Sequence, residues 1–237
     1  MSDKPLISGF EKIILIGLVV FFGYGIYKNG GISLYEKTEE TTIFDGKTTG
    51  TPIGFAIYNT NQKSKDYDNV KDLFRPGHAD FTYFHKYGLR DYRGGGRSSA
   101  RETAARVAGG AIAKLMLKEL GVSIQSGLCE VDGIKGEVND FEYAKSSKMY
   151  ALDPAKEAAQ EAAILTAKEK HDSVGGVVLT TATGVPIGLG EPLYYKLDAI
   201  LAEAMMGINA AKAVEIGDGV ASTHLKGSHF ITLINYN

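Results

Sequence analysis

From about residue 44 onward, the chain alternates between helical and strand patterns of apolar residues. Apolar or small side chains recur every three or four positions between residues 100 and 120, at Ala104, Val107, Ala108, Ala111, Ile112, Leu115 and Leu120. This spacing predicts an amphipathic helix with that stripe facing a core. Gly121 is expected to end the helix as a C-terminal cap. The Ser-x-x-Glu spacing of Ser99 and Glu102 predicts a capping box at its start.

Further helices and strands follow the same two periods. The alternation of Ile53, Phe55 and Ile57 predicts a half-buried strand, and the apolar runs 122–131 and 177–179 predict two more, with a turn at residues 132–133. Asp153 and Pro154 are expected to open an alanine-rich helix that ends near residue 170, with the aspartate as N-cap. A glycine-rich turn, 186–191, then precedes a third predicted helix over 192–206.

The first 43 residues follow a different pattern. Residues 13–27 are almost continuously apolar and are flanked by Lys12 and Lys28. A spanning helix needs about 20 apolar residues, and this run is shorter and contains three glycines. Two interpretations remain open: a membrane anchor, or a leader foreign to the rest of the chain.

Composition sets wider limits. With 237 residues, 44% hydrophobic and 23% charged, the chain has the composition of an ordinary globular protein of one large domain or two small ones. Its net charge of −2 argues against a protein built mainly to coat nucleic acid. The single cysteine, Cys129, excludes an internal disulfide, and no Cys/His spacing predicts a metal site.

Arginine is concentrated in one stretch of the chain. All arginines fall between residues 75 and 106, at Arg75, Arg90, Arg93, Arg97, Arg101 and Arg106, whereas the other cations are lysines. Arginine presents a flat, permanently charged fork of donors that suits carboxylate and phosphate. The stretch therefore predicts an anion-binding site, and the alternative is a solvated basic loop. Within it, Gly94, Gly95 and Gly96 precede Ser98, Ser99 and the predicted helix, an arrangement that directs backbone N–H groups at an anion.

Three blocks of sequence carry a family resemblance. Residues 75–80 (RPGHAD), 94–103 (GGGRSSARET) and 207–219 (GINAAKAVEIGDG) together resemble chorismate synthase. The resemblance covers about residues 44–227, which leaves 1–43 as an atypical leader and 228–237 as an unmatched tail. The family's initial Phe-Gly-Glu-Ser-His-Gly loop and its later Lys-Pro-Thr-Pro-Ser and Asp-Pro-Cys blocks are not found, so the fold is expected to be incomplete.

The resemblance implies an activity and a set of site residues. The family eliminates phosphate from 5-enolpyruvylshikimate 3-phosphate in a 1,4 sense to give chorismate, and it requires reduced FMN without consuming it. By resemblance, His78 is the catalytic acid near the flavin, and Arg75 and Arg101 bind substrate anions. The residues implied to hold FMN are Arg97, Ser98, Ser99, Asn209 and Ala210.

The family also implies a fold, an assembly and a location. The expected fold class is α+β, a β-α-β sandwich with helices between antiparallel sheet layers. The expected assembly is a homotetramer in the cytoplasm, with membrane association through residues 13–27 as the alternative. Because family blocks are missing, a second functional interpretation is a non-catalytic remnant with residual flavin or anion binding. Binding of single-stranded nucleic acid through the arginine, glycine and tyrosine residues is a third, opposed by the acidic remainder of the chain.

Overall fold

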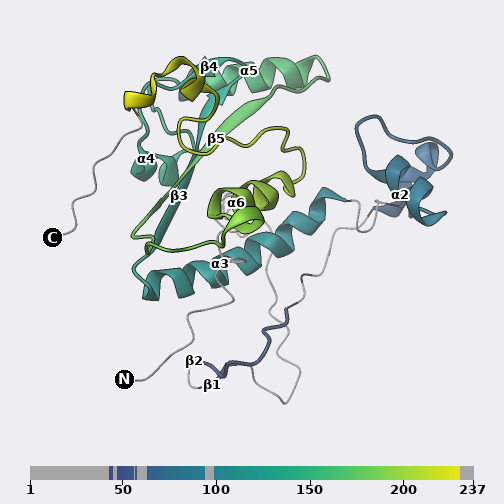
Figure 1. Cartoon of the computed structure of the whole chain (residues 1–237). Helices are drawn as coiled ribbons and strands as arrows, with labels where there is room; N and C mark the ends of the chain where they lie inside the picture. Colours follow the sequence, from purple (N-terminus) through teal and green to yellow (C-terminus); the bar gives the residue numbers. More distant parts are fainter. Residues whose placement is uncertain (1–42, 45–46, 56, 58–62, 94–98, 230–237) are drawn as a thin grey trace. The chain divides into compact units, whose positions relative to one another are not determined.

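The computed structural model describes residues 43–44, 47–55, 57, 63–93 and 99–229. The chain divides into two compact units, one formed by Ile16–Val185 and the other by Met1–Leu15 with Pro186–Asn237. The predicted leader and tail fall almost wholly outside the described residues. Figure 1 labels the elements along the sequence.

A three-stranded antiparallel sheet forms the centre of the larger unit. Its strand order is β4-β3-β5, with β3 (Ser123–Val131) between β4 (Ile134–Lys135) and β5 (Gly176–Thr183). β3 reaches β4 through Asp132 and Gly133, whose φ angles are 51° and 77°. Two such residues make a tight hairpin turn that matches the twist of the strands. The turn predicted at this place and the strand before it are therefore confirmed.

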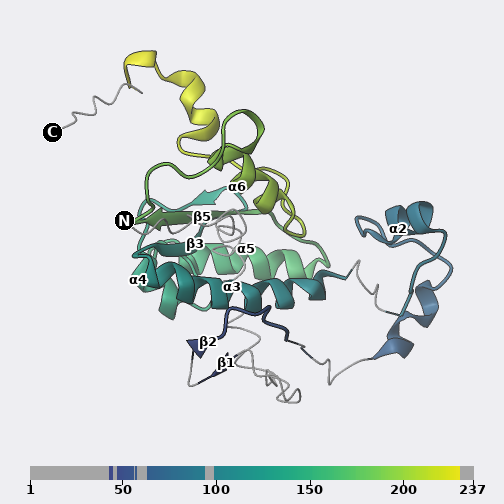
Figure 2. The same cartoon turned by 60° about the horizontal axis from the view of Figure 1, so that its bottom comes forward.

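Three helices pack against β3. They are α3 (Thr103–Glu119), α4 (Phe141–Ser146) and α5 (Glu157–Glu169). Figure 2 shows all three on the same side of the sheet. The buried apolar side chains come from the helices, from β3 and from the segment between α4 and α5, and include Leu117, Val131, Ala144, Ala151 and Leu152. The mixture of helices with an antiparallel sheet confirms the α+β class.

The segment between α4 and α5 extends the sheet for one bridge. The Leu128 N–H donates to the Tyr150 carbonyl at 2.8 Å, and the Leu152 N–H donates to the Leu128 carbonyl at 3.0 Å. Leu152 is fully buried and lies where a Cβ on Gly127 would overlap its side chain. Gly127 is thus required by close packing rather than by its backbone angles.

Helix α3 confirms the longest predicted helix but buries a different face. Gly121 ends it in the left-handed conformation, φ 77°, as expected of a C-terminal cap. The buried side of the helix contains Val107, Ala113 and Leu117, whereas Leu115 is 67% exposed. The predicted stripe through Leu115 was wrong at that end because the sheet, rather than the local spacing, selects the buried face.

The start of this helix differs from the expected capping box. A short 3-10 turn, η5 (Ala100–Glu102), precedes α3, and the Ser99 hydroxyl accepts the Arg101 N–H at 3.3 Å. Glu102 forms an ion pair with Arg106 instead of returning to Ser99. The serine therefore caps the helix as predicted, but without the reciprocal bond from the glutamate.

Two other predicted elements need adjustment. Residues 51–55 and 57 form no strand, so the predicted strand there was wrong; the nearest strands are β1 (Ile43–Phe44) and β2 (Lys47–Thr48), an antiparallel pair. The alanine-rich helix α5 begins at Glu157, after a turn in which the Asp153 carboxylate accepts the Ala155 N–H at 2.9 Å. Asp153 therefore does act as a cap, one turn before the regular helix.

A separate stretch of the larger unit contains η3 (Ser64–Val70) and α2 (Asp80–Tyr87). Helix α2 was not expected from the sequence. Gly88, φ 77°, ends this helix as a left-handed cap whose N–H donates to the Phe84 carbonyl. We call residues 63–93 the α2 segment.

The regular elements in the described part of the smaller unit are all helices or 3-10 turns. It contains η6 (Leu193–Tyr195), α6 (Leu197–Met206), η7 (Gly219–His224) and η8 (Gly227–His229). The third predicted helix is thus present but shorter, because a 3-10 turn replaces its first residues. Among the described residues, no helix is both long and apolar enough to cross a membrane; residues 13–27 lie outside them.

Candidate functional site

The centre of the α2 segment is a buried carboxylate, Asp80. Its residue is only 1% exposed. Arg90 Nη1 donates to its Oδ2 at 2.9 Å, Arg75 Nε approaches the same oxygen at 3.5 Å, and the Phe81 N–H donates to Oδ1 at 3.0 Å. Since a buried charge must be paired, these donors explain how an aspartate can be tolerated there.

Arg90 connects α2 to the residues that follow η3. Besides Asp80, it donates through Nη2 to the backbone carbonyls of Lys71 and Leu73, at 2.5 and 2.7 Å. Its guanidinium also stacks 4.8 Å from the centre of the Phe74 ring. The Arg90 side chain is only 11% exposed. Its donors are used within the chain, so it serves the fold of the segment rather than a ligand.

His78 and Arg75 lie next to one another. The Nδ1 atom of His78 accepts the Asp80 N–H at 3.1 Å and faces Arg75 Nη2, also at 3.1 Å. Both partners can only donate, so the two contacts assign Nδ1 as an acceptor and place the ring proton of neutral His78 on Nε2. The two side chains keep 23% and 27% of their surface exposed. Unlike Arg90, they can still reach a ligand.

Aromatic rings support this arrangement. Phe74, Phe81, Phe84 and His85 form one group of neighbouring rings, with the Phe74 and Phe81 centroids 5.3 Å apart in an edge-to-face contact. We call these four rings the aromatic cluster. Arg75 also lies over the Tyr67 ring, 5.7 Å from its centroid. The cluster packs α2 against Phe74, the residue just before Arg75, and so fixes the backbone position of Arg75.

Asp80 stays ionised despite its burial. Burial by itself raises the pKa of this carboxyl, but hydrogen bonds from Arg75 and the neighbouring His78 outweigh it and hold the pKa below the usual 3.8. At neutral pH the carboxylate therefore remains an acceptor for the two arginines.

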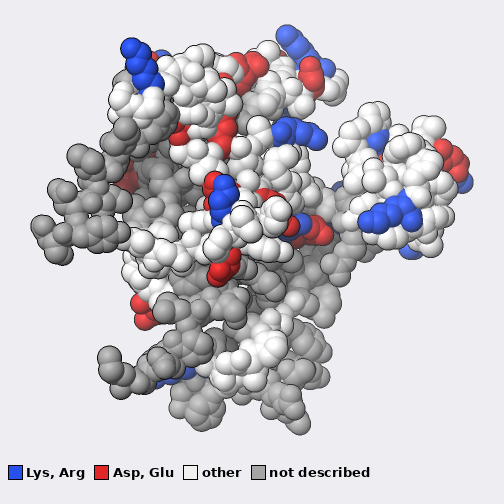
Figure 3. All heavy atoms as spheres, in the orientation of Figure 1, with Lys and Arg blue, Asp and Glu red and all other residues white. Residues whose placement is uncertain are grey.

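The other arginines within the described ranges have partners of their own. Arg93 pairs with Asp91 at 3.0 Å, Arg106 pairs with Glu102 at 2.6 Å, and Arg101 Nε donates to the Ser99 hydroxyl at 3.2 Å. Figure 3 shows the Lys and Arg atoms of the α2 segment as separate groups on the face turned to the viewer. Arginine thus binds carboxylates here, as its chemistry predicts, but several of those carboxylates belong to this chain.

The predicted site residues fall into several groups. The structure brings Arg75 and His78 together, and Ser99 together with Arg101. Arg97 and Ser98 lie outside the described residues. Asn209 and Ala210 belong to the smaller unit, where a turn follows α6 and Ala210 adopts φ 68°. No group of three or more possible metal ligands occurs in the described ranges.

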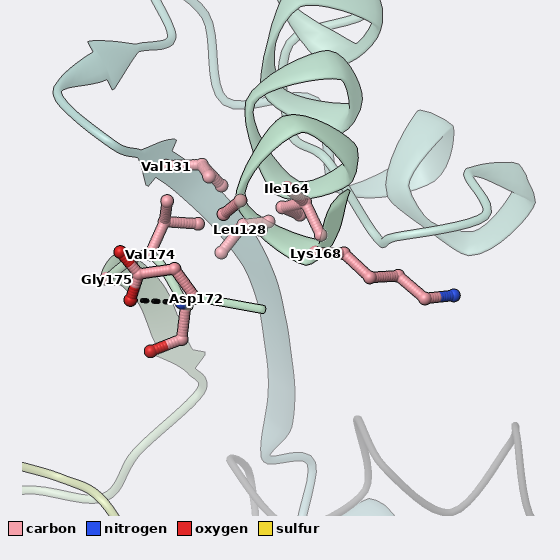
Figure 4. Close-up of a pocket in the computed structure, with 10 residues that line it drawn as sticks. Leu128, Val131, Ile164, Lys168, Asp172, Val174 and Gly175 are labelled. Atoms are coloured by element: carbon pink, nitrogen blue, oxygen red, sulfur yellow. Dashed lines mark hydrogen bonds between the residues drawn. The ribbon is translucent and has the colours of Figure 1, made fainter. Parts of the chain in front are cut away.

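Two hollows lie in the larger unit, and neither includes a predicted site residue. The first, of about 480 Å³, lies between the end of α5 and the residues before β5. Figure 4 shows its apolar floor of Leu128, Val131, Ile164 and Val174, with Lys168 extending away from it. The second, of about 570 Å³, lies between α3 and β3 and is bordered by Lys114, Lys118 and Lys145. The predicted site is therefore identified by its side-chain chemistry rather than by these hollows.

The sequence analysis missed two residues of the Asp80 network. From the sequence, Asp80 was noted only as part of the block 75–80, and Arg90 was expected to bind an anion like the other arginines. The signal that could have identified them is an acid two residues after His78, inside an arginine-rich stretch, because a lone carboxylate there needs cationic partners.

Comparison with known proteins defines the class of this chain. A sequence model of the chorismate synthase family matches residues 38–235. The chain is therefore a member of the chorismate synthase family. A solved structure described as chorismate synthase is also similar, with a TM-score of 0.61 and 34% identity over 67% of this chain and 52% of that chain.

Individual relatives are close in sequence. Chorismate synthase from a Sulfurovum species is 89% identical over 186 residues, and that of Sulfurimonas denitrificans is 75% identical over the same number. Each match covers 78% of this chain and 52% of the relative. The chain thus spans about half the length of the curated relatives it matches.

Proposed function

We propose that this chain acts in the chorismate synthase reaction, the 1,4-elimination of phosphate from 5-enolpyruvylshikimate 3-phosphate to give chorismate, in aromatic amino-acid biosynthesis. The proposal rests on family membership. The observation that carries it at the level of residues is the pairing of Arg75 with His78, each partly exposed and each held by Asp80. An anion clamp beside a proton donor is what such an elimination needs.

In this proposal, Arg75 and Arg101 bind anionic groups of the substrate. Arginine is suited to phosphate and carboxylate because its planar fork can donate two parallel hydrogen bonds. Arg75 keeps donors beyond those used by Asp80 and His78, since a guanidinium has five N–H groups. His78 acts as the acid in its imidazolium form: the proton leaves from Nε2, the ring atom opposite the one that Asp80 contacts, and the Nδ1–H of the charged ring can pair with Asp80 Oδ1, 3.3 Å away.

FMN is the proposed cofactor, and the donor set is suited to it. The guanidinium of Arg97 and the hydroxyls of Ser98 and Ser99 match the chemistry of a phosphate, and the Asn209 amide and Ala210 backbone match the polar edge of a flavin ring. When bound in reduced form, the flavin supplies the electron-rich partner that the family requires but does not consume. The protein residues bind it, orient it and exclude water.

We further propose that the protein works in the cytoplasm as a homotetramer. Both proposals come from the family. Light scattering of the purified chain measures the assembly directly, and a monomer at micromolar concentration would contradict the tetramer.

The activity test uses the purified chain with 5-enolpyruvylshikimate 3-phosphate and photoreduced FMN under anaerobic conditions. We expect chorismate above a blank that lacks protein. His78→Gln should reduce the rate by about 100-fold or more, the usual range for a lost acid. His171→Gln is the matched control, because it changes an exposed histidine that lies outside the α2 segment, and it should retain most of the rate. Chorismate no higher than the blank with wild-type protein would end the proposal for this chain.

A further inference from the structure

Asp80 connects the two side chains that the proposed function assigns to substrate and proton transfer. Its carboxylate contacts Arg75 at 3.5 Å, and its backbone N–H donates to His78 Nδ1 at 3.1 Å. Asp80 itself is 1% exposed, so it cannot be a ligand-binding group. We propose that Asp80 is a positioning residue, which orients Arg75 and fixes the tautomer of His78. Arg90 neutralises the negative charge of Asp80. The roles of Arg75 and His78 rest on the proposed function; the geometry does not.

Arg90 allows Asp80 to stay charged while it orients Arg75 and His78. An isolated carboxylate at this burial would take up a proton, and the protonated oxygen would become a donor that cannot accept from an arginine. The 2.9 Å contact from Arg90 supplies a fixed counter-charge, because Arg90 is itself anchored on the carbonyls of Lys71 and Leu73. The carboxylate therefore remains available to Arg75.

The contact with His78 determines where its proton lies. Nδ1 is within hydrogen-bond distance of two groups that only donate, the Asp80 N–H and the Arg75 guanidinium. A proton on Nδ1 would break both contacts and could pair only with Asp80 Oδ1, 3.3 Å away. The neutral ring thus carries its proton on Nε2. If Asp80 shifts, Arg75 and His78 lose their common support at the same time.

The test compares Asp80→Asn with Asp91→Asn in the full chain. Both changes remove one negative charge from the α2 segment, and both acids pair with an arginine, but the Asp91 pair is exposed, at 46% and 61%. Simple electrostatics would tighten anion binding in both variants, because each gains one unit of positive charge. Only loss of positioning weakens binding in Asp80→Asn alone.

The first measurement needs no substrate. In the nitrogen NMR spectrum, the side-chain signal of Arg75 and the ring signals of His78 are assigned with Arg75→Lys and His78→Gln. We expect the neutral form of wild-type His78 to show its proton on Nε2. Asp80→Asn keeps the backbone N–H that faces His78 Nδ1 but removes the carboxylate beside Arg75. The Arg75 signal should therefore move well beyond the change caused by Asp91→Asn, and the His78 signals should follow through the contact between Arg75 and His78. Unchanged signals in Asp80→Asn would overturn the inference, whatever the activity.

The second measurement concerns function. We expect Asp80→Asn to lower kcat/KM for chorismate formation by about tenfold or more, as loss of a charge-assisted contact predicts, and Asp91→Asn to stay within about twofold. If the wild-type chain forms no chorismate, the proposed function fails while the NMR result still decides the positioning role. Equal rates for Asp80→Asn and wild type, with an active wild type, would overturn the inference and leave the function intact.

A folding defect must be separated from a positioning defect. Asp80→Asn leaves Arg90 buried without its anion, which can unfold the α2 segment. The double variant Asp80→Asn with Arg90→Gln removes both charges and retains amides that can hydrogen-bond. With nuclear Overhauser contacts between Phe74 and Phe81 preserved, the double variant should still show displaced Arg75 and His78 signals. Wild-type signals in that folded variant would refute the role of the carboxylate.

Discussion

Replacing Leu117 or Leu115 by alanine tests which face of α3 is buried. The two positions lie on the same helix and have the same side chain, but Leu117 is 1% exposed and Leu115 is 67% exposed. The apolar spacing in the sequence assigned Leu115 to the core. The structure assigns Leu117, so the two assignments make opposite predictions for the same pair of variants.

The magnitude follows from burial. Truncation of Leu117 removes about three carbon groups from a buried site at ~0.8 kcal/mol each, and the cavity left behind brings the expected loss in the free energy of unfolding to about 3 kcal/mol, within the usual range for such changes. Leu115→Ala removes largely hydrated surface and gains helix propensity. Its expected effect is below about 1 kcal/mol.

The assay is urea unfolding followed by far-ultraviolet circular dichroism, with thermal melting as a check. Leu117→Ala should lower the midpoint without a change in slope, and should lower Tm by roughly 6–12 °C, since about 2–4 °C accompanies each kcal/mol at this chain length. Leu115→Ala should move Tm by less than about 3 °C. An equal or larger loss in Leu115→Ala would refute the buried face described above.

Three further changes test other parts of the chain. The pKa of Asp80 is held below 3.8, so its carboxylate should stabilise the α2 segment fully above that pH, and this stabilisation should disappear as the pH falls through the lowered pKa. The NMR signals of the aromatic cluster measure the transition. The transition should be absent in Asp80→Asn. Gly127→Ala should destabilise by about 1–3 kcal/mol because the new methyl group meets Leu152, whereas Gly109→Ala, with no atom within 4 Å among the described residues, should stabilise by about 0.5–1 kcal/mol in urea unfolding. Burial raises the pKa of the Cys129 thiol, so its reaction with a disulfide reagent at neutral pH should be slower in the folded protein than in urea.

Local chemistry made some elements predictable from the sequence alone. The turn at Asp132–Gly133 and the cap at Gly121 both have positive φ angles, which glycine and aspartate adopt more readily than most residues. Such signals depend only on neighbouring residues. They therefore survive whatever the rest of the fold does.

Other elements depended on distant partners. Alanine and glycine occur on several sides of α3, so more than one stripe satisfies the helical period, and contact with β3 decides between them. Helix α2 (DFTYFHKY) is rich in aromatic residues of modest helix propensity, and it is supported by the packing of its rings. Its signals were an aspartate in the first turn and a glycine after the last, both of which a pattern based on apolar spacing overlooks.

The arginine-rich stretch shows the limit of reading a ligand from composition. The residue type was informative, since Arg75, Arg90, Arg93 and Arg106 all contact carboxylates. What composition could not provide is which carboxylates are internal, because Asp80 and Arg90 are ten positions apart and meet only once α2 has formed. The same internal pairing also positions the other residues of the stretch. Because Arg90 pairs with Asp80, the fold can hold Arg75 and His78 at a partly exposed position, with donors still free for an anion. A cluster of equally solvated arginines would attract anions but could not orient them, and orientation is what separates a catalytic site from a basic surface.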